Sequence, residues 1–191
     1  MDWNSVRWPV AVAIVAGAYF GDLISDPLVF LAVIPAAYWG SDIAVRWFKK
    51  RFVRPVMLFD FGGVLAGGDH YVEPLYEMPG TRELIRRLQG RYTVALFSNM
   101  GPEMWEVWGR KYRLANLFDA VYYSGKIGVK KPDLAGFQFV LRDLPARGSE
   151  VIFLDDTPAN VDAAKRAGMK GIVFTNASDA AKQLRAMGLE F

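Results

Sequence analysis

Residues 56–60 read VMLFD, a run of four apolar residues that ends in an acid. A short run with no polar face predicts a strand buried on both sides, which is typical of a parallel sheet. A carboxylate at the end of such a strand is costly unless it has a partner. Asp60 is therefore the first candidate functional residue.

Beyond this strand, short apolar runs alternate with amphipathic stretches. Strands are predicted at 56–60, 92–98, 120–124, 151–156 and 171–175. Helices are predicted at 81–90, 102–114, 133–144, 157–168 and 178–188. Strands that alternate with helices indicate βαβ units. The expected fold is α/β, a Rossmann-like parallel sheet with helices on both faces.

Parallel α/β sheets bind ligands at the carboxyl ends of their strands. Six polar residues fall at or soon after predicted strand ends: Asp60, Ser98, Asn99, Lys131, Asp155 and Asp156. Carboxylates suit a hard cation such as Mg²⁺, whereas an ammonium and a hydroxyl suit a phosphoryl oxygen. A central carboxylate can attack phosphorus and form an aspartyl-phosphate. The pattern thus favours phosphoryl chemistry at this edge of the sheet.

Four segments resemble the ordered motifs of the haloacid dehalogenase superfamily: DFGGVL (60–65), LFSN (96–99), GVKKPD (128–133) and FLDDTPANVDAAKRAG (153–168). The resemblance covers residues 56–175 and implies a hydrolase with that family's fold. It implies that Asp60 is the nucleophile and a Mg²⁺ ligand. It also implies that Gly62 offers its main-chain carbonyl to the metal.

The other motifs carry further implied roles. Ser98 and Asn99 match the phosphate-binding position, and Lys131 matches the lysine that orients the nucleophile and the phosphate. Asp156 matches an acidic metal ligand, with Asp155 as a further ligand or as its support. Asn160 matches a position that braces this loop. Each residue also has a plainer interpretation, because polar side chains at strand ends commonly cap loops and helices.

Two departures from the family pattern bear on activity. Phosphatases of the superfamily usually carry a second Asp two residues after the nucleophile, where this chain has Gly62. General acid–base help of this kind is worth about 10² to 10⁴ in rate. Asp69 or His70 is a hypothetical substitute. In addition, only 38 positions separate Asp60 from Ser98, which leaves no room for a folded cap domain and predicts an open site.

The N-terminal part differs from the rest. Uncharged runs at 8–21 and 28–40 are each shorter than the roughly 20 apolar residues of a membrane-spanning helix. Tryptophans flank both runs, and five basic residues follow between 46 and 54, which favours a membrane interface on the cytoplasmic side. The prediction is a membrane-anchoring transmembrane hairpin at 1–54 and an α/β domain at 55–191. A buried soluble hairpin, a signal peptide and a partly inserted segment are the alternatives.

Composition excludes several classes of site. The 191 residues contain no cysteine and one histidine, so thiol nucleophiles, disulfides, zinc–thiolate centres and multi-histidine metal sites are ruled out. Hydrophobic residues make up 52% of the chain, which is ample for a core. The formal net charge of +3 is mild, and no nucleic-acid partner is expected.

Two functions remain open from the sequence. The first is a membrane-anchored, Mg²⁺-dependent phosphohydrolase, weakened by Gly62 and acting on a phosphorylated substrate. The second is a catalytically silent accessory or assembly subunit, held by the hairpin among other subunits of a membrane complex. Both place the chain at the inner or plasma membrane, with the α/β domain facing the cytoplasm.

Overall fold

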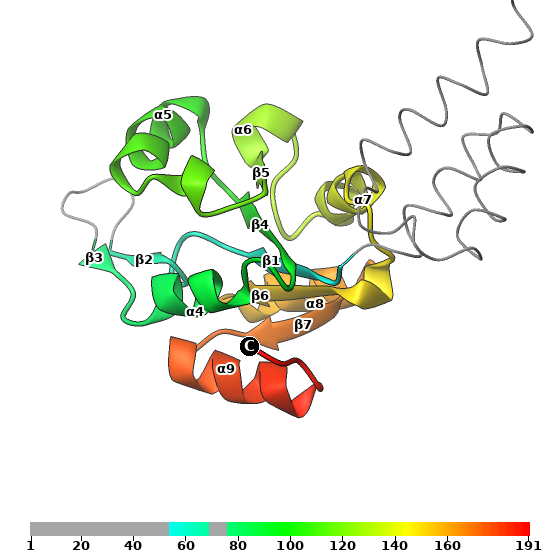
Figure 1. Ribbon diagram of the computed structural model, residues 1–191. Coiled ribbons are helices and arrows are strands. Elements are labelled where there is room, and N and C mark those ends of the chain that lie inside the picture. The colour runs from blue at the N-terminus through cyan, green and yellow to red at the C-terminus, as the bar shows by residue number, and fades with distance from the viewer. Residues whose placement is uncertain (1–53, 69–75) are drawn as a thin grey trace, which may run out of the picture. The chain divides into compact units, whose positions relative to one another are not determined.

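The apolar run after Pro55 forms β1 (Val56–Phe59), the middle strand of a parallel sheet. The computed structural model describes residues 54–68 and 76–191. Within them the strand order is β5-β4-β1-β6-β7 (Figure 1), with the other strands at β4 (Thr93–Ser98), β5 (Ala120–Tyr123), β6 (Val151–Asp155) and β7 (Lys170–Val173). All four residues of β1 are buried, because strands pair on both edges and helices cover both faces.

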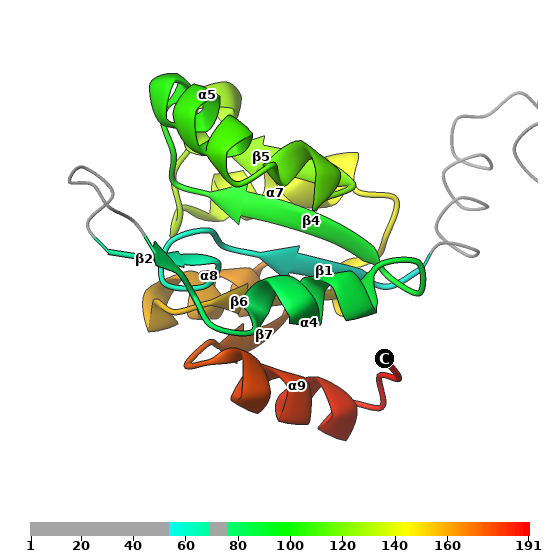
Figure 2. The same ribbon diagram turned by 60° about the vertical axis from the view of Figure 1, so that its left-hand side comes forward.

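Helices cover the sheet from both sides. One face carries α4 (Thr81–Leu88), α5 (Pro102–Lys111) and α9 (Ala177–Ala186), packed in the core cluster that contains Met57 and Phe59. The other carries α7 (Leu134–Asp143) and α8 (Pro158–Arg166), packed with Val56 and Leu58. The side chains of β1 therefore alternate between two apolar layers. Helices α4 and α9 lie side by side in both views (Figures 1 and 2).

The order of the strands creates the crevice that holds the site. The chain builds β1, β4 and β5 in one direction across the sheet and then returns to build β6 and β7 on the other side of β1. The direction reverses between β1 and β6. In sheets of this kind, ligands bind outside the carboxyl ends of the strands at such a reversal. Asp60 follows β1 there, and Asp155 ends β6.

The five predicted strands and five predicted helices are confirmed, with shifted ends. β1 ends at Phe59 rather than at Asp60, although the Asp60 N–H still donates to Leu154 O at 2.9 Å. The helix predicted to reach residue 114 ends at Lys111, because Arg113 adopts a left-handed conformation (φ 50°). A 3₁₀ turn, Leu114–Asn116, follows.

Other short elements were not predicted. The short helix α6 (Ser124–Ile127) follows β5, and a 3₁₀ turn spans Gly148–Glu150. A small antiparallel pair, β2 (Ala66–Gly67) and β3 (Tyr76–Glu77), lies between β1 and α4. Strands of two residues are too short to show a hydrophobic period, so sequence reasoning has no signal for them.

The predicted membrane hairpin lies outside the described residues, apart from Arg54 at its end. Asp69 and His70 also lie outside them. Across 54–68 and 76–191, none of the helices combines the length and the apolar character needed to cross a bilayer.

Candidate active site

The site begins at the turn that follows β1. The N–H groups of Leu65 and Ala66 both donate to Phe61 O, at 2.8 and 3.0 Å, and the Gly63 N–H donates to Ala66 O at 2.8 Å. Gly63 has a φ of +69°, which costs a glycine little. This turn reverses the chain immediately after Asp60 and leaves its carboxylate at the end of the strand.

Lys131 provides the positive charge of the site. Its side chain is almost fully buried, and its Nζ lies 2.8 Å from Asp60 Oδ1 and 2.6 Å from Asp155 Oδ2. The rings of Phe97 and Phe153 lie 5.6 and 5.1 Å from the same ammonium, measured to their centroids. Aromatic faces and two carboxylates thus compensate the desolvation of this cation.

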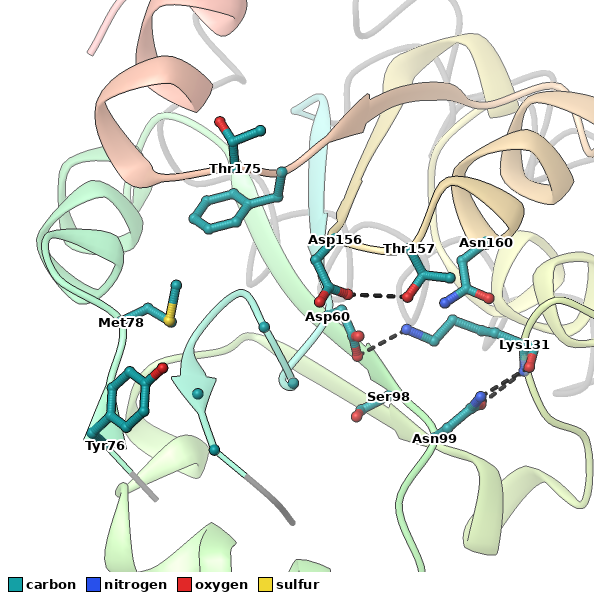
Figure 3. A pocket seen from close by; sticks show the side chains of 15 residues that line it. Asp60, Tyr76, Met78, Ser98, Asn99, Lys131, Asp156, Thr157, Asn160 and Thr175 are labelled. Carbon is teal, nitrogen blue, oxygen red and sulfur yellow. Dashed lines mark hydrogen bonds and ion pairs between the residues drawn. The ribbon is translucent and has the colours of Figure 1, made fainter. Parts of the chain in front are cut away.

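Asn99 holds the main chain of Lys131. Its Nδ2 donates to Lys131 O at 2.9 Å, and its Oδ1 accepts from the Lys131 N–H at 2.8 Å (Figure 3). Both ends of the amide are used, and the pair joins the end of β4 to the loop before α7. The structure therefore gives Asn99 a positioning contact. Its predicted contact with phosphate stays a prediction.

The two adjacent acids of the fourth motif face different surroundings. Asp155 is fully buried and accepts hydrogen bonds from Lys131 Nζ, from the Thr157 N–H at 2.8 Å and from Asn160 Nδ2 at 3.0 Å. The Asn160 contact agrees with the bracing role that the motif implies. Asp156 is exposed, and its Oδ1 accepts from Thr157 Oγ1 at 3.1 Å.

Glycine is required opposite Asp156. A Cβ on Gly63 would lie 1.9 Å from Asp156 Oδ2, far inside van der Waals contact. The Asp156 carboxylate therefore packs directly on the backbone of the turn after β1. This contact brings the acids of β1 and β6 together, and one oxygen from each of Asp60, Asp155 and Asp156 lies within 4.8 Å of the others.

Negative charge exceeds positive charge at this edge of the sheet. Burial raises the pKa of Asp60; the Lys131 ammonium lowers it and the Asp155 carboxylate raises it, and the net result is a pKa above the ordinary value. The carboxylates of Asp60, Asp155 and Asp156 outnumber the single ammonium, so the site carries a net negative charge and several oxygen ligands, which fits a hard divalent cation. Asp60, Asp156 and the main chain of Gly62 are the groups that would hold Mg²⁺.

A pocket of about 610 Å³ opens over these residues. Asp60, Gly62, Ser98, Asn99, Lys131 and Asp156, all predicted site residues, line it. Asp155 does not line the pocket, because its side chain lies beneath Lys131 and Asn160. Its predicted role as a metal ligand stays a prediction. Ser98, at the end of β4, is buried and lines the pocket, and its predicted contact with a phosphoryl oxygen stays a prediction.

Sequence reasoning missed part of the pocket lining. Tyr76, Met78, Thr157, Phe174 and Thr175 also line it. Figure 3 shows Tyr76 and Met78 on the side of the pocket away from Lys131. Tyr76 and Met78 come from the β3 region, and Phe174 and Thr175 follow β7. The signals in the sequence were the position of Thr157 within the fourth motif and of Thr175 at a predicted strand end.

Known proteins resemble this chain in sequence and in fold. A family model described as haloacid dehalogenase-like hydrolase matches residues 42–168. The chain is 35% identical over 101 residues to a drimenol cyclase of Aspergillus calidoustus, which is 53% of this chain and 19% of that protein. It is 32% identical over 106 residues to a sesquiterpene phosphatase of Aspergillus oryzae, 54% of each chain.

A third relative is a chloroplast flavin mononucleotide hydrolase of Arabidopsis thaliana, 30% identical over 113 residues, or 59% of this chain and 46% of that protein. The chain thus spans from a fifth to about half of the length of these relatives. Among solved structures, a haloacid dehalogenase family enzyme of Bacteroides thetaiotaomicron, crystallised with magnesium and inorganic phosphate, matches with a TM-score of 0.56 at 18% identity. That match covers 65% of this chain and 95% of the other, and it shows the fold alone.

Proposed function

The chain belongs to the haloacid dehalogenase-like hydrolases, and we propose that it is a Mg²⁺-dependent phosphohydrolase that forms an aspartyl-phosphate on Asp60. The observation that carries this proposal is the contact of Lys131 Nζ with both Asp60 and Asp155, beside a pocket lined by Ser98 and Asp156. The phosphatase and hydrolase activities named for two relatives support it.

Each residue of the site has a part in this reaction. The Asp60 carboxylate attacks phosphorus, the bond from phosphorus to the ester oxygen breaks, and the released alkoxide takes a proton from solvent. Water then attacks the aspartyl-phosphate, which releases inorganic phosphate and a proton and restores the carboxylate. Lys131 orients Asp60, and Ser98 binds a phosphoryl oxygen. Bound Mg²⁺ would supply positive charge against the repulsion between the phosphate and the acids.

The absence of the usual acid at position 62 shapes the expected kinetics. Among the pocket residues that the structure describes, Asp60 and Asp156 are the sole carboxylic acids and there is no imidazole. A leaving group that departs without a proton donor must carry its own negative charge. Aryl phosphates, whose phenolate is a stable anion, are therefore expected to react faster than alkyl phosphates.

The test is turnover of an aryl phosphate by the full-length chain, with and without Mg²⁺, compared with Asp60→Asn. We expect Mg²⁺-dependent release of phosphate that falls at least about 10³-fold in the variant, because the nucleophile is lost. Trapping the aspartyl-phosphate with a substrate that carries a labelled phosphoryl group detects the covalent intermediate directly. Release that is equal in the wild type and in Asp60→Asn would refute the proposal.

Gly62 stands where phosphatases of the superfamily usually carry an Asp, and this difference also favours a second candidate function, that of a catalytically silent accessory subunit of a membrane complex. Native migration after mild extraction discriminates between the two. A large, stable assembly with no turnover favours the accessory subunit, whereas an active monomer or dimer favours the enzyme.

We propose membrane attachment through residues 1–54 in either case, on the evidence of the uncharged runs 8–21 and 28–40. Retention of the chain in membranes washed with alkaline carbonate tests it.

A further inference from the structure

The pocket has two chemically different ends. At one end lie Asp60, Ser98, Lys131 and Asp156, the groups assigned to phosphoryl transfer. The other end is lined by Tyr76, Met78 and Phe174, which we call the apolar wall, together with the polar side chain of Thr175. Figure 3 shows Met78 beside Tyr76, on the side of the pocket away from Lys131. If the phosphoryl group of the substrate binds at the first end, the organic group of the substrate contacts the second end.

The apolar wall is built by specific backbone contacts. In the small antiparallel pair, Tyr76 stands opposite Gly67, and a Cβ on Gly67 would lie 2.5 Å from Tyr76 Cζ. The Tyr76 ring therefore lies directly on the Gly67 backbone. The Met78 N–H donates to Leu65 O at 2.9 Å, which ties the main chain at Met78 to the turn after Asp60. The wall is thus held at a fixed position relative to the nucleophile.

Phe174 reaches the pocket from the other side of the site. Its N–H donates to Asp155 O at 2.9 Å, one residue before the exposed acid Asp156. It is buried, whereas 61% of the Tyr76 surface is exposed. One buried and one exposed aromatic side chain beside the polar groups of the pocket give an apolar substituent a surface to cover, and that surface loses water when it is covered.

The charges restrict the ligand further. Of the lining residues that the structure describes, Lys131 is the one cation, and its ammonium already contacts Asp60 and Asp155. Among these described residues, a second phosphate or a carboxylate on the substrate would meet no further counter-charge. It would also lose its hydration shell against Tyr76 and Met78.

We propose that the pocket selects phosphate monoesters whose esterified organic group is apolar and bears no charged substituent, with that group lying along the apolar wall. This inference rests on the proposed phosphohydrolase function. It excludes diphosphates, nucleotides and acidic phosphopeptides as preferred substrates. Because the pocket is open and not a closed cavity, a group longer than a methyl can lie along the wall, and we expect the preference to grow from a methyl to a butyl group.

The experiment uses three phenyl phosphates with equal leaving-group chemistry on the full-length chain with Mg²⁺. They carry a 4-methyl, a 4-butyl or a 4-(3-carboxypropyl) substituent, so the last two differ in terminal charge at equal length. A fully buried methylene is worth about fourfold in kcat/KM and a half-covered one about twofold. We expect the butyl compound to exceed the methyl compound about eightfold and to exceed the carboxylate by at least as much.

Substitutions in the apolar wall test whether the wall causes the preference for the butyl compound. Tyr76→Ser and Met78→Ser are each expected to reduce the butyl-to-methyl ratio of kcat/KM towards one. The matched control is Val107→Ser on α5, which replaces an exposed apolar residue that does not line the pocket. Its ratio should equal that of the wild type. Equal kcat/KM for the three compounds, or a preference for the carboxylate, would overturn the inference and leave the proposed function standing.

A binding measurement separates the two proposals. The Kd values of non-hydrolysable 4-methylbenzyl- and 4-butylbenzylphosphonate are measured on the same proteins. If no compound is hydrolysed but the butyl compound binds more tightly and loses this advantage in Tyr76→Ser, the proposed function fails and the apolar wall stands as a binding site. If hydrolysis is absent and the two phosphonates bind equally, both proposals fail.

Discussion

The amide of Asn99 pairs with both main-chain polar groups of Lys131, at 2.9 Å to its C=O and 2.8 Å from its N–H. The two residues are 32 positions apart, and their hydrogen bonds fix the loop that carries the buried ammonium. The cation that orients Asp60 is thus positioned by a side chain that does not contact Asp60.

This pairing makes Asn99 a residue whose loss should act through Lys131. Asn99→Ala removes two hydrogen bonds of about 1 kcal/mol each, and we expect unfolding to become easier by about 1–2 kcal/mol. If the enzyme proposal holds, kcat should also fall, because the ammonium is less well placed. Urea unfolding and turnover measure both effects. Asn116→Ala, at an exposed asparagine, is the control; an equal loss in both variants would contradict the prediction.

Removing the buried cation should produce a pH-dependent loss of stability. Lys131→Met leaves Asp60 and Asp155 together without their shared partner, which we expect to cost about 3–5 kcal/mol at pH 8. The folded-state pKa of Asp60 is already raised, and the variant loses the influence that lowered it. A carboxyl with a raised pKa destabilises the fold only when it is ionised.

The sign of the pH effect follows from that shift. The loss in the free energy of unfolding of Lys131→Met should be small at a pH near 3.8, the ordinary carboxyl pKa. It should grow as the pH rises through the folded-state pKa of Asp60. Chemical unfolding in EDTA at pH 4.5 and pH 8 measures it. Lys130→Met, at the exposed neighbouring lysine, should change little at either pH. A loss of equal size at both pH values would show that charge is not the cause.

Gly63→Ala should disturb the site for a reason beyond the backbone angle of this residue. Gly63→Ala places a Cβ 1.9 Å from Asp156 Oδ2, whereas Gly90→Ala, at a similar φ of +83°, meets nothing within 4 Å. Both variants carry a backbone strain of about 1–2 kcal/mol. We expect only Gly63→Ala to displace Asp156 and to weaken Mg²⁺ binding, about tenfold or more, in calorimetry. Equal Mg²⁺ affinity in the two variants would contradict this.

Thr81 offers a stabilising substitution. Its hydroxyl is fully buried at the start of α4 and has no hydrogen-bond partner among the described residues. Thr81→Val keeps the shape and removes the unsatisfied polar group, so we expect a gain of up to about 1 kcal/mol in the free energy of unfolding. Thr81→Ser keeps the hydroxyl and loses a methyl group, so it should destabilise. Thermal unfolding of both variants decides the matter.

Much of the fold follows from local patterns. The run VMLF must be buried on both sides, and the later apolar runs alternate with amphipathic stretches, so the parallel α/β class and its elements were predictable. The carboxyl ends of parallel strands lie at one edge, which is why Asp60, Ser98 and Asp156 could be assigned to one site before the structure. The pocket contains all three.

The remaining features depend on contacts between distant segments. The sequence presents Asp155 and Asp156 as equivalent neighbours, but side chains alternate along an extended chain, so Asp155 is buried against Lys131 and Asp156 lies on Gly63. The apolar wall joins Tyr76 and Met78 to Phe174, almost a hundred positions later in the chain. Local sequence determined which residues form strands and which polar side chains lie at the strand ends. Tertiary packing alone decided which acid contacts the lysine and which apolar side chains share the pocket with Asp60, because those choices depend on what lies opposite each strand end.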